Sequence, residues 1–201
     1  DATVAYVNNK DITISQLMKL IPGPDFPTGG VIIGKDIIKQ GYNKGRGSFK
    51  IRGATNAVLQ LKKSELRRCV ITASSGNHGA ALAMAVSKRG GVTKVVMPKN
   101  TPKTKVNNVI RNGGDIIWCE ANQISRENTL KKLLLETQGT IIHPYNDLKI
   151  IEGQATIAKE LLFEVPDLDA IICPVSGGGL LSGILNYVKR KNPNINFFVR
   201  N

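Results

Sequence analysis

From residue 54 onward, hydrophobic residues alternate between two spacings along the chain. Long segments carry apolar side chains at helical spacing, and short, continuous apolar runs separate them. We expect helices at 54–68, 77–91, 101–114, 124–139, 150–165 and 179–192, and strands at 69–73, 94–98, 115–120, 140–144, 169–175 and 195–199. Strands that alternate with helices in this way are typical of an α/β fold with a parallel sheet, whose ligands bind at the carboxyl ends of the strands.

Residues 1–53 follow a different pattern. We expect a helix at 14–21, a turn-rich boundary with three prolines and three glycines at 22–30, a strand at 30–34 and a short helix at 35–47. In SFKIR at 48–52, Phe49 and Ile51 alternate with polar neighbours, which predicts a half-buried strand. We therefore divide the chain into an N-terminal α+β segment, 1–53, and an α/β domain, 54–201.

The composition is that of a globular protein. The chain is 41% hydrophobic and 21% charged, which is enough apolar content to bury a core. No apolar run reaches the roughly 18 residues that span a bilayer, and the first residues lack the features of a signal peptide. Cys69, Cys119 and Cys173 lie in separate apolar runs, which indicates buried free thiols. We expect a soluble, cytoplasmic protein without a membrane partner.

The net charge of +13 has two interpretations. It comes from 28 Lys and Arg residues against 15 Asp and Glu residues, and the excess is spread along the chain. A nucleic-acid groove combines a basic stripe with aromatic side chains, but aromatic residues make up only 5% of this chain. A solvated basic surface is therefore favoured and a nucleic-acid partner is disfavoured. An anionic small ligand is compatible with this charge.

Two glycine-containing turns each follow a predicted strand and precede a predicted helix. They are Ser74–Gly79 and Ser176–Leu180. Backbone N–H groups at such a helix start favour anions, and consecutive glycines let a phosphate approach the backbone closely. Neither turn has the spacing of a dinucleotide fingerprint or a P-loop. For the second turn alone, an ordinary tight turn is an equal alternative.

Several segments resemble the serine racemase and serine/threonine dehydratase family. They are GSFKIRGATNAV, SSGNHGAALA, MPKNTPKTKVNNVIRNGGDIIWCE, HPYND, GQATIAKEL and PVSGGGLLSGI, and they cover about residues 47–196 in order. The resemblance implies a fold-type II enzyme that uses pyridoxal 5′-phosphate (PLP), with a three-layer parallel-sheet α/β fold like the tryptophan synthase β subunit. It implies a small domain at about 69–146, holding three or four parallel strands, and a partial large domain at 147–201. The implied partner is an amino acid, serine or threonine, and a homodimer is possible.

The same resemblance implies roles for individual residues. Lys50 would bond covalently to PLP, Ser75 would be the acid or base on the opposite face of the cofactor, and Asn77 would contact the cofactor's 3′-oxygen. The phosphate would be held by the turn formed by Ser176, Gly177, Gly178, Gly179 and Leu180. The substrate carboxylate would be bound by Ser74, Asn77, His78 and Arg126.

These residue types suit proton transfer at the α-carbon of an amino acid. A lysine amine near a cationic group has a lowered pKa and can be both covalent carrier and base. Lys50 on one face and the Ser75 hydroxyl on the other would allow racemisation, and loss of the β-hydroxyl would be dehydration. Taken alone, Lys50 is more typical of a surface lysine and His78 of a helix start, so this interpretation depends on the whole set.

Two departures from the family pattern lead us to expect impaired activity. The family has a Lys-x-Glu element before its lysine, where this chain has Lys39, Gln40 and Gly41. The family also continues beyond 195–199 with the partner of the pyridine nitrogen and divalent-metal ligands. We therefore expect no metal site, weak PLP capture and little or no turnover.

The N-terminal segment resembles another family, the A subunit of DNA gyrase and bacterial topoisomerase IV. The run from DIT to PGPDFPTGG carries the resemblance, which covers about residues 1–53. It excludes that family's active-site tyrosine, so Tyr6 and Tyr42 are not candidates. Both resemblances share GSFKIRG at 47–53, which indicates a chimera joined there. A DNA-binding fragment and a fusion product without biochemical function are the alternatives to a PLP enzyme.

Lys50 lies where the two resemblances overlap. The topoisomerase-like context predicts a strand over SFKIR, whereas the PLP-family context places the lysine at a helix start. We expect Lys50 near a strand-to-helix junction. We also expect the Ser176–Leu180 turn to cap a helix that begins near Gly179 and to offer N–H groups to a phosphate.

Overall fold

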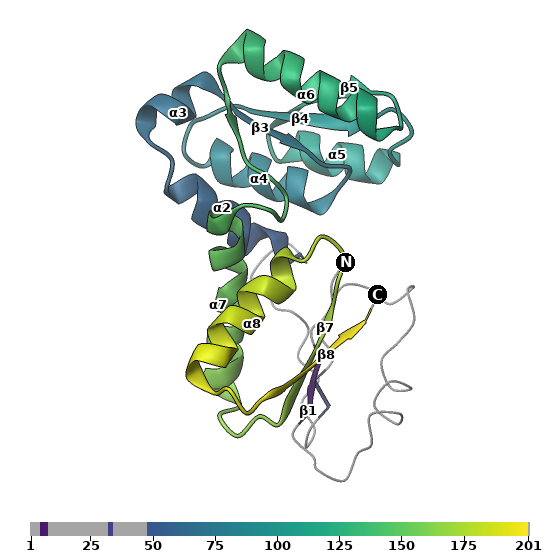
Figure 1. Cartoon of the computed structure of the whole chain (residues 1–201). Helices are drawn as coiled ribbons and strands as arrows, with labels where there is room; N and C mark the ends of the chain where they lie inside the picture. Colours follow the sequence, from purple (N-terminus) through teal and green to yellow (C-terminus); the bar gives the residue numbers. More distant parts are fainter. Residues whose placement is uncertain (1–4, 8–31, 34–47, 201) are drawn as a thin grey trace. The chain divides into compact units, whose positions relative to one another are not determined.

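The computed structural model describes residues 5–7, 32–33 and 48–200. Contacts divide the chain into two units (Figure 1). The first unit is Lys50–Gly153, and the second combines Asp1–Phe49 with Gln154–Asn201. Each unit contains one four-stranded sheet. Every helix in the described part of the chain is too short or too polar to cross a membrane.

The sheet of the first unit consists of four parallel strands. They are β3 (Val70–Ala73), β4 (Thr93–Pro98), β5 (Gly114–Cys119) and β6 (Thr140–Ile141), in the order β5-β4-β3-β6. Val95, Val96 and Met97 of β4 are fully buried, because a strand covered on both faces has no polar side. The prediction of three or four parallel strands for this region is confirmed, and the fourth, β6, has only two residues.

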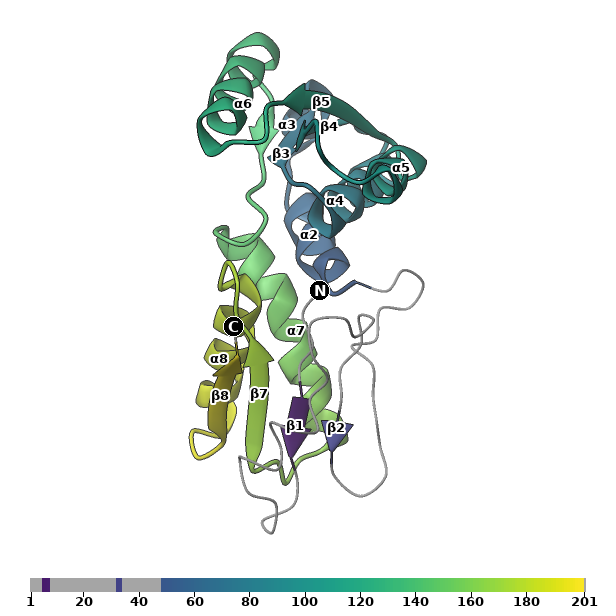
Figure 2. The same ribbon diagram turned by 90° about the vertical axis from the view of Figure 1, so that its right-hand side faces the viewer.

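Helices cover both faces of this sheet. They are α4 (Asn77–Ser87) and α5 (Lys103–Arg111) on one face and α6 (Gln123–Thr137) on the other (Figures 1 and 2). Val95 and Met97 pack with α4 and α5, whereas Val96 packs with Leu133 of α6. Successive side chains of a strand point to opposite faces of the sheet, so β4 contacts the helices of both layers. The predicted three-layer α/β fold is confirmed.

The prediction of a strand over SFKIR is wrong. Lys50 is the first residue of α2 (Lys50–Leu59), which is followed by the short α3 (Lys63–Arg68) in place of one predicted helix. Ile51, Ala54 and Val58 contribute to one apolar cluster. Their helical spacing extends through ten residues, whereas the alternation of Phe49 and Ile51 covers only five, so the longer pattern determines the backbone.

Two glycines allow α2 to approach α7 (Leu148–Glu164) closely. A Cβ atom on Gly153 would lie 2.5 Å from the Cα of Gly53 and 2.6 Å from the carbonyl oxygen of Arg52. Nearby, the side-chain amide of Asn56 donates to the carbonyl of Lys149 at 2.6 Å. This contact explains a glycine in a helix interior, where it costs about 1 kcal/mol relative to alanine. It also fixes the helix that begins with Lys50.

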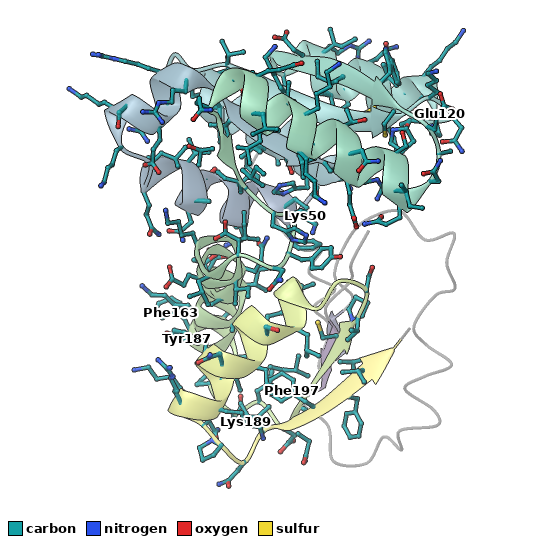
Figure 3. The ribbon with its side chains drawn as sticks, turned by 45° about the horizontal axis from the view of Figure 1, so that its top comes forward. Lys50, Glu120, Phe163, Tyr187, Lys189 and Phe197 are labelled. Carbon is teal, nitrogen blue, oxygen red and sulfur yellow. The ribbon has the colours of Figure 1, made fainter. Side chains whose placement is uncertain are left out.

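In the second unit, helices pack against a sheet that includes two parallel strands, β7 (Ala170–Pro174) and β8 (Asn196–Arg200). Helix α8 (Gly179–Lys191) and the later turns of α7 cover it, and Ile171, Ile184 and Ile195 are central to the core. The Lys189 ammonium group donates to the carbonyl of Ile195 at 2.8 Å and lies 5.6 Å from the centre of the Phe197 ring (Figure 3). These elements confirm the strands and the helix predicted for this region.

Two N-terminal strands join the same sheet. β1 (Ala5–Val7) pairs antiparallel with β7 and parallel with β2 (Ile32–Ile33), which gives the order β2-β1-β7-β8. β2 falls within the strand predicted at 30–34. The other elements expected before residue 48, and most of the topoisomerase-like segment, lie outside the described residues.

The three cysteines are free and buried, as predicted. Burial raises the pKa of the Cys173 thiol to about 12, and it also raises the pKa of Cys119 despite the nearby Arg126. Both thiols therefore stay protonated at neutral pH.

Candidate active site

The carboxyl ends of the parallel strands in the first unit carry four loops, and two of the predicted site residues, Ser74 and Ser75, lie in the first of them. These loops are 74–76, 99–102, 120–122 and 142–147. Helices α4, α5 and α6 begin directly after the first three loops. The N-terminus of a helix carries a partial positive charge and unpaired N–H groups. This edge of the sheet is therefore suited to anionic ligands.

Lys50 lies half-buried at the first position of α2 (Figure 3). Its ammonium nitrogen donates a hydrogen bond to the carbonyl oxygen of Pro144 at 2.8 Å. Burial lowers the pKa of Lys50, because removal from water disfavours the charged form. A larger fraction of this amine is consequently unprotonated, and therefore nucleophilic, than for a lysine in water.

A tight turn presents the carbonyl of Pro144 to Lys50. The Nδ1 atom of His143 accepts backbone N–H groups from Asn146 at 2.9 Å and from Tyr145 at 3.4 Å. The ring of Tyr145 packs edge-on against that of His143, with centres 4.5 Å apart. Burial and the nearby Lys50 lower the pKa of His143, against an opposing effect of Asp147. A neutral imidazole keeps Nδ1 available as an acceptor.

His78 is a second neutral imidazole near Lys50. It is buried in the first turn of α4. Burial, together with repulsion from Lys50 and His143, lowers its pKa to about 3. An interaction with the Ile142 backbone opposes this lowering of the pKa but falls short of a hydrogen bond. Neither ring nitrogen of His78 has a hydrogen-bond partner among the described residues. His78 can therefore donate an N–H to a ligand but carries no charge at neutral pH.

Ser74 holds the start of α4 in place. Its hydroxyl oxygen accepts the N–H groups of Gly79 at 3.1 Å and Gly76 at 3.3 Å. These bonds satisfy donors at a helix start, where no intrahelical acceptor exists. Asn77, the first residue of α4, lies within the turn that Ser74 stabilises.

Ser75 and Arg126 line one pocket, although they are 51 positions apart in the sequence. The pocket has a volume of about 280 Å³ and lies entirely within the first unit. Its lining residues are Ser75, Pro98, Asn100, Thr101, Pro102, Lys105, Ala121 and Arg126. The structure thus brings together two of the predicted site residues and adds Lys105 and Thr101, which our sequence analysis missed.

The Ser176–Leu180 turn belongs to the second unit. Helix α8 begins at Gly179, where the sequence predicts its start, and Gly178 precedes it with a φ of 82°. That left-handed backbone favours glycine, and a Cβ atom added there would meet no atom within 4 Å. Leu180 is buried in the core of the unit. The turn is therefore anchored on one side and open at Gly178.

Comparisons with known proteins identify the family. The sequence profile described as pyridoxal-phosphate dependent enzyme matches residues 37–200. The chain belongs to the pyridoxal-phosphate dependent enzyme family. This finding confirms PLP as the cofactor of its family and the predicted fold-type II class.

Three relatives of this family member are informative. A serine racemase from Arabidopsis thaliana is 52% identical over 149 residues, which cover 74% of this chain and 45% of that protein. A β-hydroxyaspartate dehydratase from Paracoccus denitrificans is 48% identical over 137 residues, which cover 68% and 44%. The structure of maize serine racemase matches with a TM-score of 0.74 and 45% identity, over 76% of this chain and 46% of that one. The chain spans less than half the length of these relatives.

The residues of this family member fit the cofactor. Lys50 provides an amine of lowered pKa at a fixed position, as a covalent bond to an aldehyde requires. The turn at Gly178 leaves open space in front of its backbone, as a phosphate requires. Each of these groups, within its own unit, therefore fits one part of PLP.

Proposed function

We propose that the chain supplies the lysine-bearing part of a PLP-dependent enzyme that racemises or dehydrates a β-hydroxy amino acid. Lys50 would bond to PLP, and the Ser176–Leu180 turn would bind its phosphate. When bound, PLP withdraws the electrons left on the substrate's α-carbon after its proton departs. Neutral Lys50 would take that proton, and the Ser75 hydroxyl would return one from the other side.

The loop after β3 and the first turn of α4 would orient the substrate. Neutral His78 and the backbone N–H groups of Asn77 would bind the α-carboxylate without adding a full charge, and Ser74 would keep this loop in shape through its bonds to Gly76 and Gly79. Return of the proton from the opposite side gives racemisation, and departure of the β-hydroxyl gives dehydration. Serine and threonine both carry the hydroxyl that the second reaction needs.

The observation that carries this proposal is the environment of Lys50. Its amine is half-buried, bonded to Pro144 and lowered in pKa, next to two imidazoles of lowered pKa. Lys63 in α3, by contrast, is exposed.

Borohydride trapping tests the assignment. The full chain is mixed with PLP, reduced with borohydride, digested and analysed by mass spectrometry. We expect the reduced cofactor on the peptide containing Lys50, with an absorbance band that Lys50→Ala removes and Lys63→Ala keeps. Labelling spread evenly over exposed lysines, or a band unchanged in Lys50→Ala, would overturn the proposal.

A DNA-binding fragment is the second candidate. The topoisomerase-like run within 1–53 and the net charge of +13 support it, and we infer a chimera from the shared GSFKIRG string. Binding of duplex DNA that weakens steeply with salt, together with no Lys50 labelling, would favour this candidate. The absence of both would favour the fusion product without biochemical function.

A further inference from the structure

The side chain of Arg89 joins the end of α4 to the end of α2. Its Nη1 atom donates hydrogen bonds to the carbonyl oxygen of Val58 and, at 3.3 Å, to that of Leu61. Val58 lies in the last turn of α2, where the final carbonyls of a helix lack intrahelical donors. A cation is also favoured at a helix C-terminus by the helix dipole. Arg89 therefore supplies both a donor and a charge to this end of α2.

The backbone that carries Arg89 is itself held in a turn. The N–H group of Arg89 donates to the carbonyl of Val86 at 2.9 Å, and that of Gly91 donates to the same carbonyl at 3.1 Å. Val86 is fully buried in the core of the first unit. The half-buried side chain of Arg89 therefore starts from a fixed point.

Helices α2 and α4 lie side by side (Figures 1 and 2). At one end, Lys50 is the first residue of α2 and His78 lies in the first turn of α4, close enough for repulsion between their charges. At the other end, Arg89 follows α4 and bonds to α2. The two helices therefore run in the same direction, with the residues of the candidate site at their starts and Arg89 at their ends.

The contact between α2 and α7 makes α2 a lever. Gly53 packs against Gly153 of α7, and it lies three residues after Lys50 and five residues before Val58. At 1.5 Å per residue, the two arms are about 4.5 Å and 7.5 Å long. A sideways displacement of about 1 Å at Val58 would therefore move Lys50 by about 0.6 Å. Reacting groups have to stay within about 0.5 Å of their productive positions, so the clamp at Val58 matters at Lys50.

We propose that Arg89 is a positioning residue for Lys50, which it holds against the carbonyl of Pro144 and beside His78 by clamping the far end of α2. The inference rests on the proposed function, in which Lys50 bonds to PLP and moves the α-proton. Arg89 acts only through α2. Without the clamp, α2 tilts about Gly53 and the Lys50 amine becomes more exposed to water.

The pH dependence of Lys50 acetylation tests this role without cofactor. The full chain is labelled with a trace of acetic anhydride at a series of pH values, and the peptide containing Lys50 is quantified by mass spectrometry. The midpoint of the rate profile reports the pKa of the amine, which burial lowers. We expect Arg89→Met to move the midpoint upward, towards that of a lysine in water, and Arg89→Lys to move it less. An unchanged midpoint in Arg89→Met would overturn the proposal.

Two control variants separate positioning from general effects of charge and stability. Lys88→Met removes a neighbouring exposed cation, and Leu133→Val loosens the core on the opposite face of the sheet from α4. Both should leave the Lys50 midpoint unchanged. Urea unfolding followed by Trp118 fluorescence compares the stabilities, and all labelling is done without urea. A midpoint that moves equally in Leu133→Val and Arg89→Met would overturn the proposal in favour of a merely structural role.

Turnover provides an independent measurement. With PLP and serine, we expect Arg89→Met to lower kcat at least fivefold and to change KM less than twofold, because the substrate-orienting residues of α4 keep their places. A fall in kcat/KM that comes from KM alone would overturn the assignment. Absence of PLP from Lys50 in the unchanged chain would instead contradict the proposed function, and the acetylation profile would still decide whether Arg89 positions Lys50.

Discussion

Replacing Gly153 with alanine tests whether the contact between α2 and α7 supports the site. The added Cβ would lie 2.5 Å from the Cα of Gly53, 2.6 Å from the oxygen of Arg52 and 2.8 Å from the nitrogen of Gly53. Carbon atoms normally pack at about 3.5–4.0 Å, so the helices would have to separate by about 1 Å. All three atoms belong to the backbone of α2, and no side-chain rotation can relieve the overlap.

The expected loss of stability follows from two opposing effects. Overpacking of a tight contact costs about 1–3 kcal/mol, and rigid backbone atoms place this case at the upper end. Alanine in a helix interior gains about 1 kcal/mol over glycine. We therefore expect Gly153→Ala to lower the free energy of unfolding of the first unit by about 2 kcal/mol.

Trp118 provides a specific probe for this measurement. It is the one tryptophan of the chain and lies in β5 of the first unit, so its fluorescence during urea unfolding reports on that unit. Glu152→Ala is the matched control, because this neighbour in α7 is exposed, and we expect a change below about 0.5 kcal/mol. A Gly153→Ala chain as stable as the unchanged one would refute the reasoning.

Three further results are expected. His143→Ala should speed acetylation of Lys50, measured by peptide mass spectrometry, because the turn that presents Pro144 loses its hydrogen-bond acceptor. His143→Asn should preserve the rate, and equal rates in all three chains would contradict the role of His143 in this turn. Ser74→Ala should destabilise the first unit by about 1 kcal/mol in urea unfolding, since the start of α4 loses its side-chain acceptor, whereas Ser74→Thr should retain most of the stability. The free energy of unfolding of the first unit should fall by on the order of a few kcal/mol as pH drops from about 6.5 towards 3. In this range His78 binds a proton in the unfolded chain but not in the folded form, where its pKa is about 3. A pH dependence unchanged in His78→Gln would count against this explanation.

The strands of the first unit could be predicted because parallel strands covered on both faces are continuous apolar runs. Residues 94–98 show this pattern, and β4 occupies almost the same range. The conformation of Lys50 was harder to predict. Five residues of alternating polarity fit a strand, whereas the helical spacing of Ile51, Ala54 and Val58 extends further along the chain, and these side chains pack in one cluster. The predicted start of α8 at Gly179 succeeded because three glycines and a following apolar run mark a helix start.

The surroundings of the site depend on contacts that no local pattern contains. The carbonyl of Pro144 that binds Lys50 lies 94 positions away in the chain. Lys105 belongs to a polar segment, and only the fold places its side chain against Gly76 in the pocket. His143 could have been noticed in HPYND, but its Nδ1 becomes an acceptor only through the turn that it closes.

The strand order β5-β4-β3-β6 has a consequence for how this site can change during evolution. The chain proceeds outward from β3 to β5 and then returns to β6 on the other side of β3, so the order of strands reverses between β3 and β6. His78 lies in the first turn of the helix that follows β3, and His143 lies in the loop that follows β6. Both histidines lie close enough to Lys50 for mutual repulsion. Such a reversal point opens a crevice that is set by topology. Substitutions in the loops can therefore alter which ligand is bound while leaving the location of the site unchanged.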